Sequence, residues 1–117
     1  MDFAQRTIDL ARQNVEEGGR PFATVIVKDG EILAESPNKV AQTSDPTAHA
    51  EILAIRDACR KLGTEHLVGA TIYVLAHPCP MCLGSLYLRG RLPHHPRRVR
   101  AALRRRPQVL RTRLLLR

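Results

Sequence analysis

This sequence has few cysteines and no long apolar run, and its last quarter has no acidic residue. Three cysteines in 117 residues give no disulfide framework, which suits a reducing compartment. No stretch approaches the roughly 18 apolar residues of a membrane span, and the first residues lack the regions of a secretory signal. We therefore expect a cytoplasmic protein that makes no contact with a membrane.

The shortage of acidic residues after position 88 divides the chain in two. Residues 1–88 carry eleven Asp or Glu and eight Lys or Arg, a net charge of −3, whereas residues 89–117 carry eleven Arg and no acid, a net charge of +11. The overall charge of +8 therefore belongs to the second segment, and only there is a contact with nucleic acid expected. We predict a single domain at 1–88 and an arginine-rich tail at 89–117.

Within residues 1–88 the apolar pattern alternates between helical and strand spacing. It predicts helices at 2–17, 48–62 and 80–88, and strands at 22–27, 31–35 and 70–76. The last of these strands is apolar enough to be buried on both faces. Residues 36–47 are polar and are interpreted as a loop. The order α-β-β-α-β-α predicts a layered α/β sandwich.

Two short motifs carry the chemistry: His49-Ala50-Glu51, and Pro78-Cys79-Pro80-Met81-Cys82 about thirty residues later. His49, Cys79 and Cys82 offer one imidazole and two thiolates to Zn²⁺, which leaves its fourth tetrahedral position open to water. Glu51 is placed to act as the acid and base. A lone histidine or cysteine is more often a buried structural residue, but this combination predicts a catalytic zinc centre at two helix starts.

From residue 22 to residue 88 the chain resembles the zinc-dependent cytidine/deoxycytidylate deaminase superfamily, nearest the branch of bacterial guanine deaminases and tRNA adenosine deaminases. The strings that carry the resemblance are Ala-Thr-Val-Ile-Val-Lys-Asp-Gly at 23–30, Thr-Ser-Asp-Pro-Thr-Ala-His-Ala-Glu-Ile at 43–52 and Pro-Cys-Pro-Met-Cys-Leu-Gly-Ser-Leu-Tyr at 78–87. The chain departs from the branch at His77, where these proteins often carry Glu. His77 is either a group that faces the substrate or metal, or a surface residue at the end of a strand.

The resemblance implies a three-layer α/β/α sandwich with a mixed sheet, which is incomplete at its C-terminal end in this chain. It implies Zn²⁺ at the three ligands above and proton transfer by Glu51. It also implies that Asn38 hydrogen-bonds the base and that Phe22, Asp45 and Thr47 line the pocket. A chain with an intact C-terminal part is expected to form a homodimer.

The reaction that the resemblance implies is hydrolytic deamination of a small nucleobase or nucleoside, with guanine first. Water attacks the carbon that bears the amino group, Glu51 transfers the protons, and ammonia leaves. A tRNA-specific adenosine deaminase is the alternative enzyme. A basic nucleic-acid-binding protein that keeps zinc only for structure is the alternative outside enzymes.

The tail resembles nothing in the superfamily and allows two interpretations. It is either a basic arm that contacts phosphates, or a misframed translation of a GC-rich gene. With free choice of synonymous codons, a shift of one nucleotide across residues 91–116 restores acidic and aromatic residues, and this favours the frameshift. The strand at 70–76 would then keep an uncovered edge, and we expect the chain to be inactive or barely stable.

Overall fold

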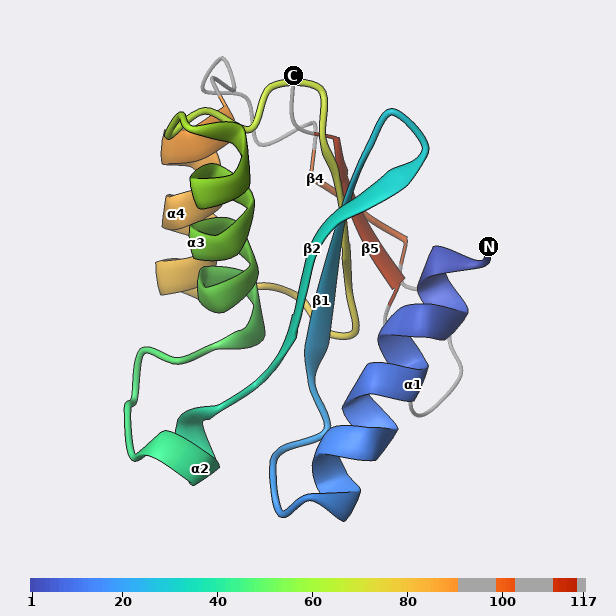
Figure 1. The fold of residues 1–117 in the computed structure, drawn as a ribbon, viewed down its shortest axis with the longest axis vertical. Helices are drawn as coiled ribbons and strands as arrows, with labels where there is room; N and C mark the ends of the chain where they lie inside the picture. Colours follow the sequence, from blue (N-terminus) through green and yellow to red (C-terminus); the bar gives the residue numbers. More distant parts are fainter. Residues whose placement is uncertain (91–98, 103–110, 116–117) are drawn as a thin grey trace.

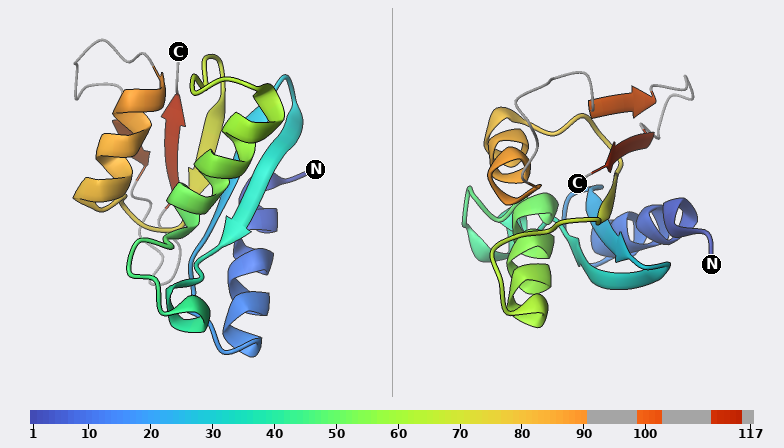
Figure 2. Two further views of the ribbon diagram at one scale, coloured as in Figure 1. Left: turned by 60° about the vertical axis from the view of Figure 1, so that its left-hand side comes forward. Right: turned by 90° about the horizontal axis from the view of Figure 1, so that it is seen from above.

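The chain folds as a sheet between two layers of helix (Figure 1). A computed structural model describes residues 1–90, 99–102 and 111–115. The elements are α1 (Phe3–Glu16), β1 (Ala23–Lys28), β2 (Glu31–Pro37), α2 (Val40–Thr43), α3 (Ala50–Leu62), β3 (Thr71–Val74), α4 (Pro80–Gly90), β4 (Val99–Ala102) and β5 (Arg111–Leu115). Helix α1 covers one face of the sheet, and α3 and α4 cover the other (Figure 2). The predicted α/β/α sandwich is therefore confirmed.

The sheet has the strand order β2-β1-β3-β5-β4. Strands β1 and β2 are joined at Asp29 and Gly30, whose φ angles of 52° and 76° match the two-residue hairpin turn that the Asp-Gly pair predicts. Every pairing between described strands is antiparallel, rather than mixed as the resemblance implied. Strands β3 and β4 run in the same direction, but β5 lies between them and prevents a parallel contact.

The second edge of β3 is covered, contrary to the expectation from the sequence. Strand β5 pairs with β3 in the register Thr71↔Leu115 to Val74↔Thr112. A strand ladder is made of backbone N–H and C=O groups, so the arginine-rich composition of the tail does not prevent this pairing. The rest of the tail, at 91–98, 103–110 and 116–117, lies outside the described residues.

The face of the sheet under α3 and α4 carries the main hydrophobic core. Ile26 pairs with Ile72 across β1 and β3, and both side chains are fully buried. The cluster around them draws on the sheet, on both helices and on the connection before β3: Ile26, Ala34, Ala54, Ile55, Ala58, Leu67, Ala70, Ile72, Val74 and Leu86. The opposite face contacts α1, where the rings of Phe3 and Tyr73 lie 5.7 Å apart at 47°.

Two predicted elements differ in detail from the structure. Strand β3 is shorter than predicted, and its residues alternate between half-buried and fully buried, so only one of its faces lies in the core. The predicted loop at 36–47 contains the short helix α2, in which the Thr43 N–H donates to the Lys39 carbonyl at 3.0 Å. A single helical turn without an apolar stripe leaves no periodic signal in the sequence.

No helix in the described part of the chain has the length and apolar character that crossing a membrane requires.

Candidate active site

The two motifs singled out in the sequence meet at the starts of α3 and α4. His49 is the N-cap of α3, with an extended backbone, and its carbonyl accepts from the Leu53 N–H at 3.1 Å. The helix thus begins at Ala50, two residues later than predicted. Cys79 directly precedes α4, and its carbonyl accepts from the Leu83 N–H at 2.8 Å. Because each ligand sits at a helix start, the backbone fixes its position.

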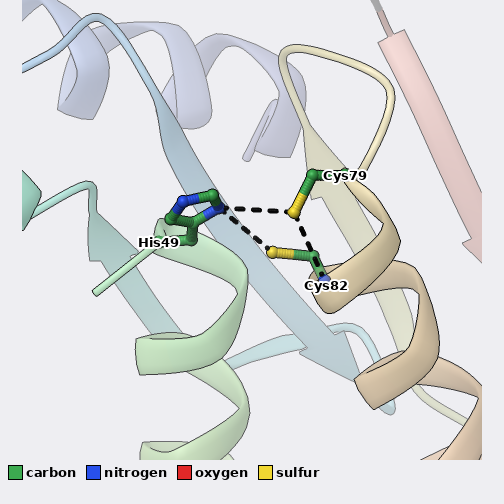
Figure 3. A group of neighbouring side chains, drawn as sticks. All are labelled: His49, Cys79 and Cys82. Atoms are coloured by element: carbon green, nitrogen blue, oxygen red, sulfur yellow. Dashed lines mark hydrogen bonds between the residues drawn. The ribbon is translucent and has the colours of Figure 1, made fainter. Parts of the chain in front are cut away.

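The side chains of His49, Cys79 and Cys82 point toward one another (Figure 3). His49 Nδ1 lies 3.5 Å from the Sγ atoms of both cysteines, and all three ligand atoms lie within 4.8 Å of one another. Tetrahedral Zn²⁺ with bonds of about 2.0 Å to nitrogen and about 2.3 Å to sulfur separates such atoms by about 3.6 Å. One imidazole and two cysteine sulfurs therefore fit zinc in both chemistry and spacing.

The surroundings of Cys82 favour the protonated form of its thiol. Burial raises the pKa of the Cys82 thiol, and the neighbouring Glu51 and Cys79 raise it further. A divalent cation reverses this balance, because a thiol that coordinates a metal is deprotonated outright. The Cys82 N–H also lies 3.5 Å from Cys79 Sγ, where it donates to that sulfur.

Glu51 stands in the first turn of α3, beside the ligand cluster. The Thr24 hydroxyl donates to Glu51 Oε1 at 3.2 Å, and Thr24 is fully buried in β1. A strand residue thereby fixes one oxygen of the carboxylate. The sequence analysis missed Thr24, because the strand pattern indicates which face of the sheet Thr24 lies on but not which side chain it contacts.

A pocket of about 200 Å³ opens beside this cluster. Its walls are Arg20, Phe22, Asn38, His49, Glu51, Ala76, His77 and Cys79. Asn38 is 5% exposed, and its Oδ1 accepts from the Val40 N–H at 3.0 Å. Because that oxygen is engaged, the amide NH₂ is the group that Asn38 can offer to a molecule in the pocket.

The structure places the other pocket predictions in two groups. Phe22 lies in the pocket wall, as does His77, which is also exposed. Asp45 and Thr47 do not belong to that wall. They bond to each other instead, since Asp45 Oδ1 accepts from the Thr47 N–H at 2.8 Å and from its hydroxyl at 2.7 Å. These bonds, the one from the hydroxyl first, lower the pKa of Asp45.

The sequence analysis also missed Arg20 and Ala76 as wall residues. Arg20 precedes a proline at the end of a Gly-Gly turn, and Ala76 lies at the end of the predicted strand 70–76. Neither position has a pattern that marks it as functional.

Known proteins are similar to this chain in sequence. The family described as "Cytidine and deoxycytidylate deaminase zinc-binding region" matches residues 1–91. A guanine deaminase of Bacillus subtilis (strain 168) is 51% identical over 86 residues, which cover 73% of this chain and 55% of the relative. A tRNA-specific adenosine deaminase of Aquifex aeolicus (strain VF5) is 47% identical over 86 residues, which cover 74% of this chain and 57% of the relative.

The fold agrees with these matches. The X-ray structure of guanine deaminase from Bacillus subtilis superimposes with a TM-score of 0.72 and 50% identity, over 74% of this chain and 56% of that one. The chain spans about half the length of the curated relatives it matches.

Proposed function

This chain belongs to the cytidine and deoxycytidylate deaminase family, and on that premise we propose that it is a zinc-dependent hydrolytic deaminase of a purine base or nucleoside, with guanine as the first candidate. The observation that carries the proposal is the cluster of the three zinc ligands, two of which, His49 and Cys79, share the wall of one small pocket with Glu51. A carboxylate beside a metal centre with three protein ligands suits catalysis better than a purely structural role.

In the proposed reaction Zn²⁺, when bound to His49, Cys79 and Cys82, would supply an acidified water, whose pKa is lowered to about 7. Glu51 takes up one proton of the attacking water and passes it to a ring nitrogen, and it then transfers the second proton of the same water to the amine, which leaves as ammonia. The hydrogen bond from Thr24 to Oε1 leaves Oε2 to carry these protons. The amide NH₂ of Asn38 donates to an acceptor on the base, and Phe22 packs against its ring.

Two properties support a free base over a large substrate. The pocket is smaller than the range of about 300–1,000 Å³ that is typical of sites for drug-sized ligands. Residues 1–88 carry a net charge of −3, which does not favour a polyanion. The 51% identity to a guanine deaminase points the same way.

A tRNA adenosine deaminase is the second candidate, supported by the 47% identity to the enzyme of that name from Aquifex aeolicus. Ammonia release by the full chain loaded with zinc should be measured with guanine, cytidine, adenosine and an anticodon stem-loop. We expect release from guanine first, because β5 covers the edge of β3 whose exposure was the reason to expect an inactive chain. Inosine formed only in the stem-loop would reverse the order of the two candidates, and zinc binding without release from any substrate would favour the structural role.

We also propose that the deaminase domain is residues 1–88 and that the tail is a misframed segment. The family match supports this division, because it ends at residue 91, and so does the abrupt change from acidic to basic composition. The test is the nucleotide sequence of codons 85–117. A reading frame shifted by one nucleotide should encode acidic and aromatic residues, and failure to do so would leave a basic arm as the alternative.

A further inference from the structure

One buried polar side chain on α1 lies behind the pocket and is not explained by the core. Asn14 is 1% exposed. Its Nδ2 donates to the Arg20 carbonyl at 2.8 Å and to the Asn38 carbonyl at 2.7 Å, and its Oδ1 accepts from Gln42 Nε2 at 2.8 Å. Both hydrogens of the amide are used, so only one orientation of the side chain satisfies the network.

The two carbonyls that Asn14 binds belong to two neighbouring segments of the pocket wall. Arg20 and Asn38 both contribute to this wall, and they lie eighteen positions apart in the chain. A backbone bond joins the same segments, since the Asn38 N–H donates to the Phe22 carbonyl at 2.9 Å. The Lys39 N–H in turn donates to the Ala48 carbonyl at 3.0 Å, next to the ligand His49.

The backbone at Gly19 is shaped around this amide. The Gly19 N–H donates to the Asn14 carbonyl at 2.7 Å. A Cβ atom at Gly19 would come within 2.6 Å of Asn14 Cγ and even closer to the side-chain nitrogens of Asn14 and Gln42. A glycine is therefore required here for space, and any larger residue would push the Asn14 amide away from the two carbonyls.

We propose that Asn14 is a positioning residue for substrate binding, which holds Asn38 against the segment at 20–22 in the pocket wall. The inference rests on the proposed function for its role in binding a base, but the clamp itself is a structural claim. Without the two donated hydrogen bonds the Arg20 and Asn38 carbonyls would lose buried partners, and the pocket would open on the side where Asn38 meets the base.

The first test measures amide hydrogen exchange in the full-length Asn14→Asp variant. Aspartate keeps the shape of asparagine but cannot donate, and it would place an oxygen against two carbonyls. Exchange at the Asn38 and Val40 amides should rise at least tenfold relative to the amides of β1. The matched control is Thr7→Val, since Thr7 is equally buried on α1 but, among the described residues, its hydroxyl donates to the Phe3 carbonyl of its own helix and not to a pocket segment.

In a second variant, Gly19→Ala, the added methyl group would displace the Asn14 amide, and exchange at the Asn38 and Val40 amides should rise as in Asn14→Asp. Unchanged exchange at Asn38 and Val40 in both variants would overturn the proposal. A rise of equal size at β1 would also overturn it, because it would show general destabilisation.

The functional readout is the split between KM and kcat for guanine at equal zinc content. Asn14→Asp should raise KM at least tenfold and change kcat by less than threefold, because the zinc ligands and Glu51 are untouched. A fall in kcat with KM unchanged contradicts a role in binding. If the unmodified chain deaminates no base, the proposed function fails, whereas the exchange experiment still decides whether the clamp exists.

Discussion

The two faces of the sheet differ in the types of residue that are buried against them. Under α3 and α4 the buried residues are almost all apolar and form one cluster, and the zinc ligands stand at the helix starts of that side. Under α1 two of the buried helix residues, Thr7 and Asn14, are polar, and a groove of about 580 Å³ runs beside Val15 and Phe22. The first face is packed with apolar side chains, and the second combines the ring contact between Phe3 and Tyr73 with the polar contacts of Asn14.

This difference follows from what each face has to position. Metal ligands must be held within a few tenths of an ångström, which close packing achieves because side chains in a dense core have little room to move. A substrate pocket instead has to join loops that are remote in sequence, and directional hydrogen bonds do this better than apolar contacts. The α1 face supplies such bonds through Asn14.

Loss of zinc is the largest effect that we expect, and it should follow only from changes on the α3 and α4 side. His49→Ala or Cys82→Ala should reduce zinc from about one ion per chain to nearly none, because each of the three ligands supplies a large part of the binding free energy, which is about 10–16 kcal/mol for structural zinc in zinc-finger peptides. Metal analysis of the purified proteins measures this. Thr7→Val, on the α1 face, is the control and should keep its zinc. Full zinc in both ligand variants would contradict the assigned ligand set.

Removal of the Glu51 carboxylate, on the same face, should lower turnover without loss of zinc. Glu51→Gln should keep zinc and lower kcat by about 10²–10⁴, the range that a positioned acid or base contributes. The measurement is ammonia release at saturating substrate, together with metal content. Turnover within tenfold of the unmodified chain would show that another group moves the protons.

Truncation of a side chain should lower the free energy of unfolding more on the α3 and α4 side than on the α1 side. Ile72→Ala should lower the free energy of unfolding by about 2–5 kcal/mol, because Ile72 is fully buried within the cluster on the α3 and α4 side. Val15→Ala on the α1 face should cost about 0.5 kcal/mol or less, since Val15 is 49% exposed. Urea denaturation measures both. Equal costs would contradict the view that only one face is densely packed.

The smallest effect concerns an ion pair that ties α1 to β2. Arg6 Nη2 and Nε donate to the carboxylate of Glu35 at 2.6 and 3.0 Å and hold its pKa below the ordinary value of 4.5. Because the folded-state pKa is lowered, the stabilisation is present above about pH 4.5 and is lost as the pH falls through the lowered value. Arg6 is 40% exposed, so Glu35→Gln should cost at most about 1 kcal/mol at pH 7.

The measurement for this pair is the difference in unfolding free energy between the unmodified chain and Glu35→Gln at pH 7 and at pH 3. The difference should shrink at the lower pH. A difference that stays constant would show that the pair does not stabilise the fold.

Most of the helices, the hairpin and the zinc ligands could be predicted from local patterns. The Asp29-Gly30 turn, the helix stop at Gly63 and the H-x-E and P-C-x-x-C motifs each depend on residues close together in sequence. The role of Asp45 and Thr47 as pocket residues stays a prediction, and the two hydrogen bonds between them were not expected from the sequence. The pairing of β5 with β3 could not be predicted, because backbone groups carry it.

The sequence by itself determined the donor set for zinc and, apart from α2, the order of the elements within residues 1–88, since residue type and short-range spacing specify both. Only the tertiary structure decided which remote residues meet. It set Thr24 against Glu51, placed Arg20 and His77 in the pocket wall, and put Asn14 between two loops. The physical reason is that these contacts are hydrogen bonds and packing across elements. Their partners are chosen by the geometry of the packed layers, and no spacing along the chain records that geometry.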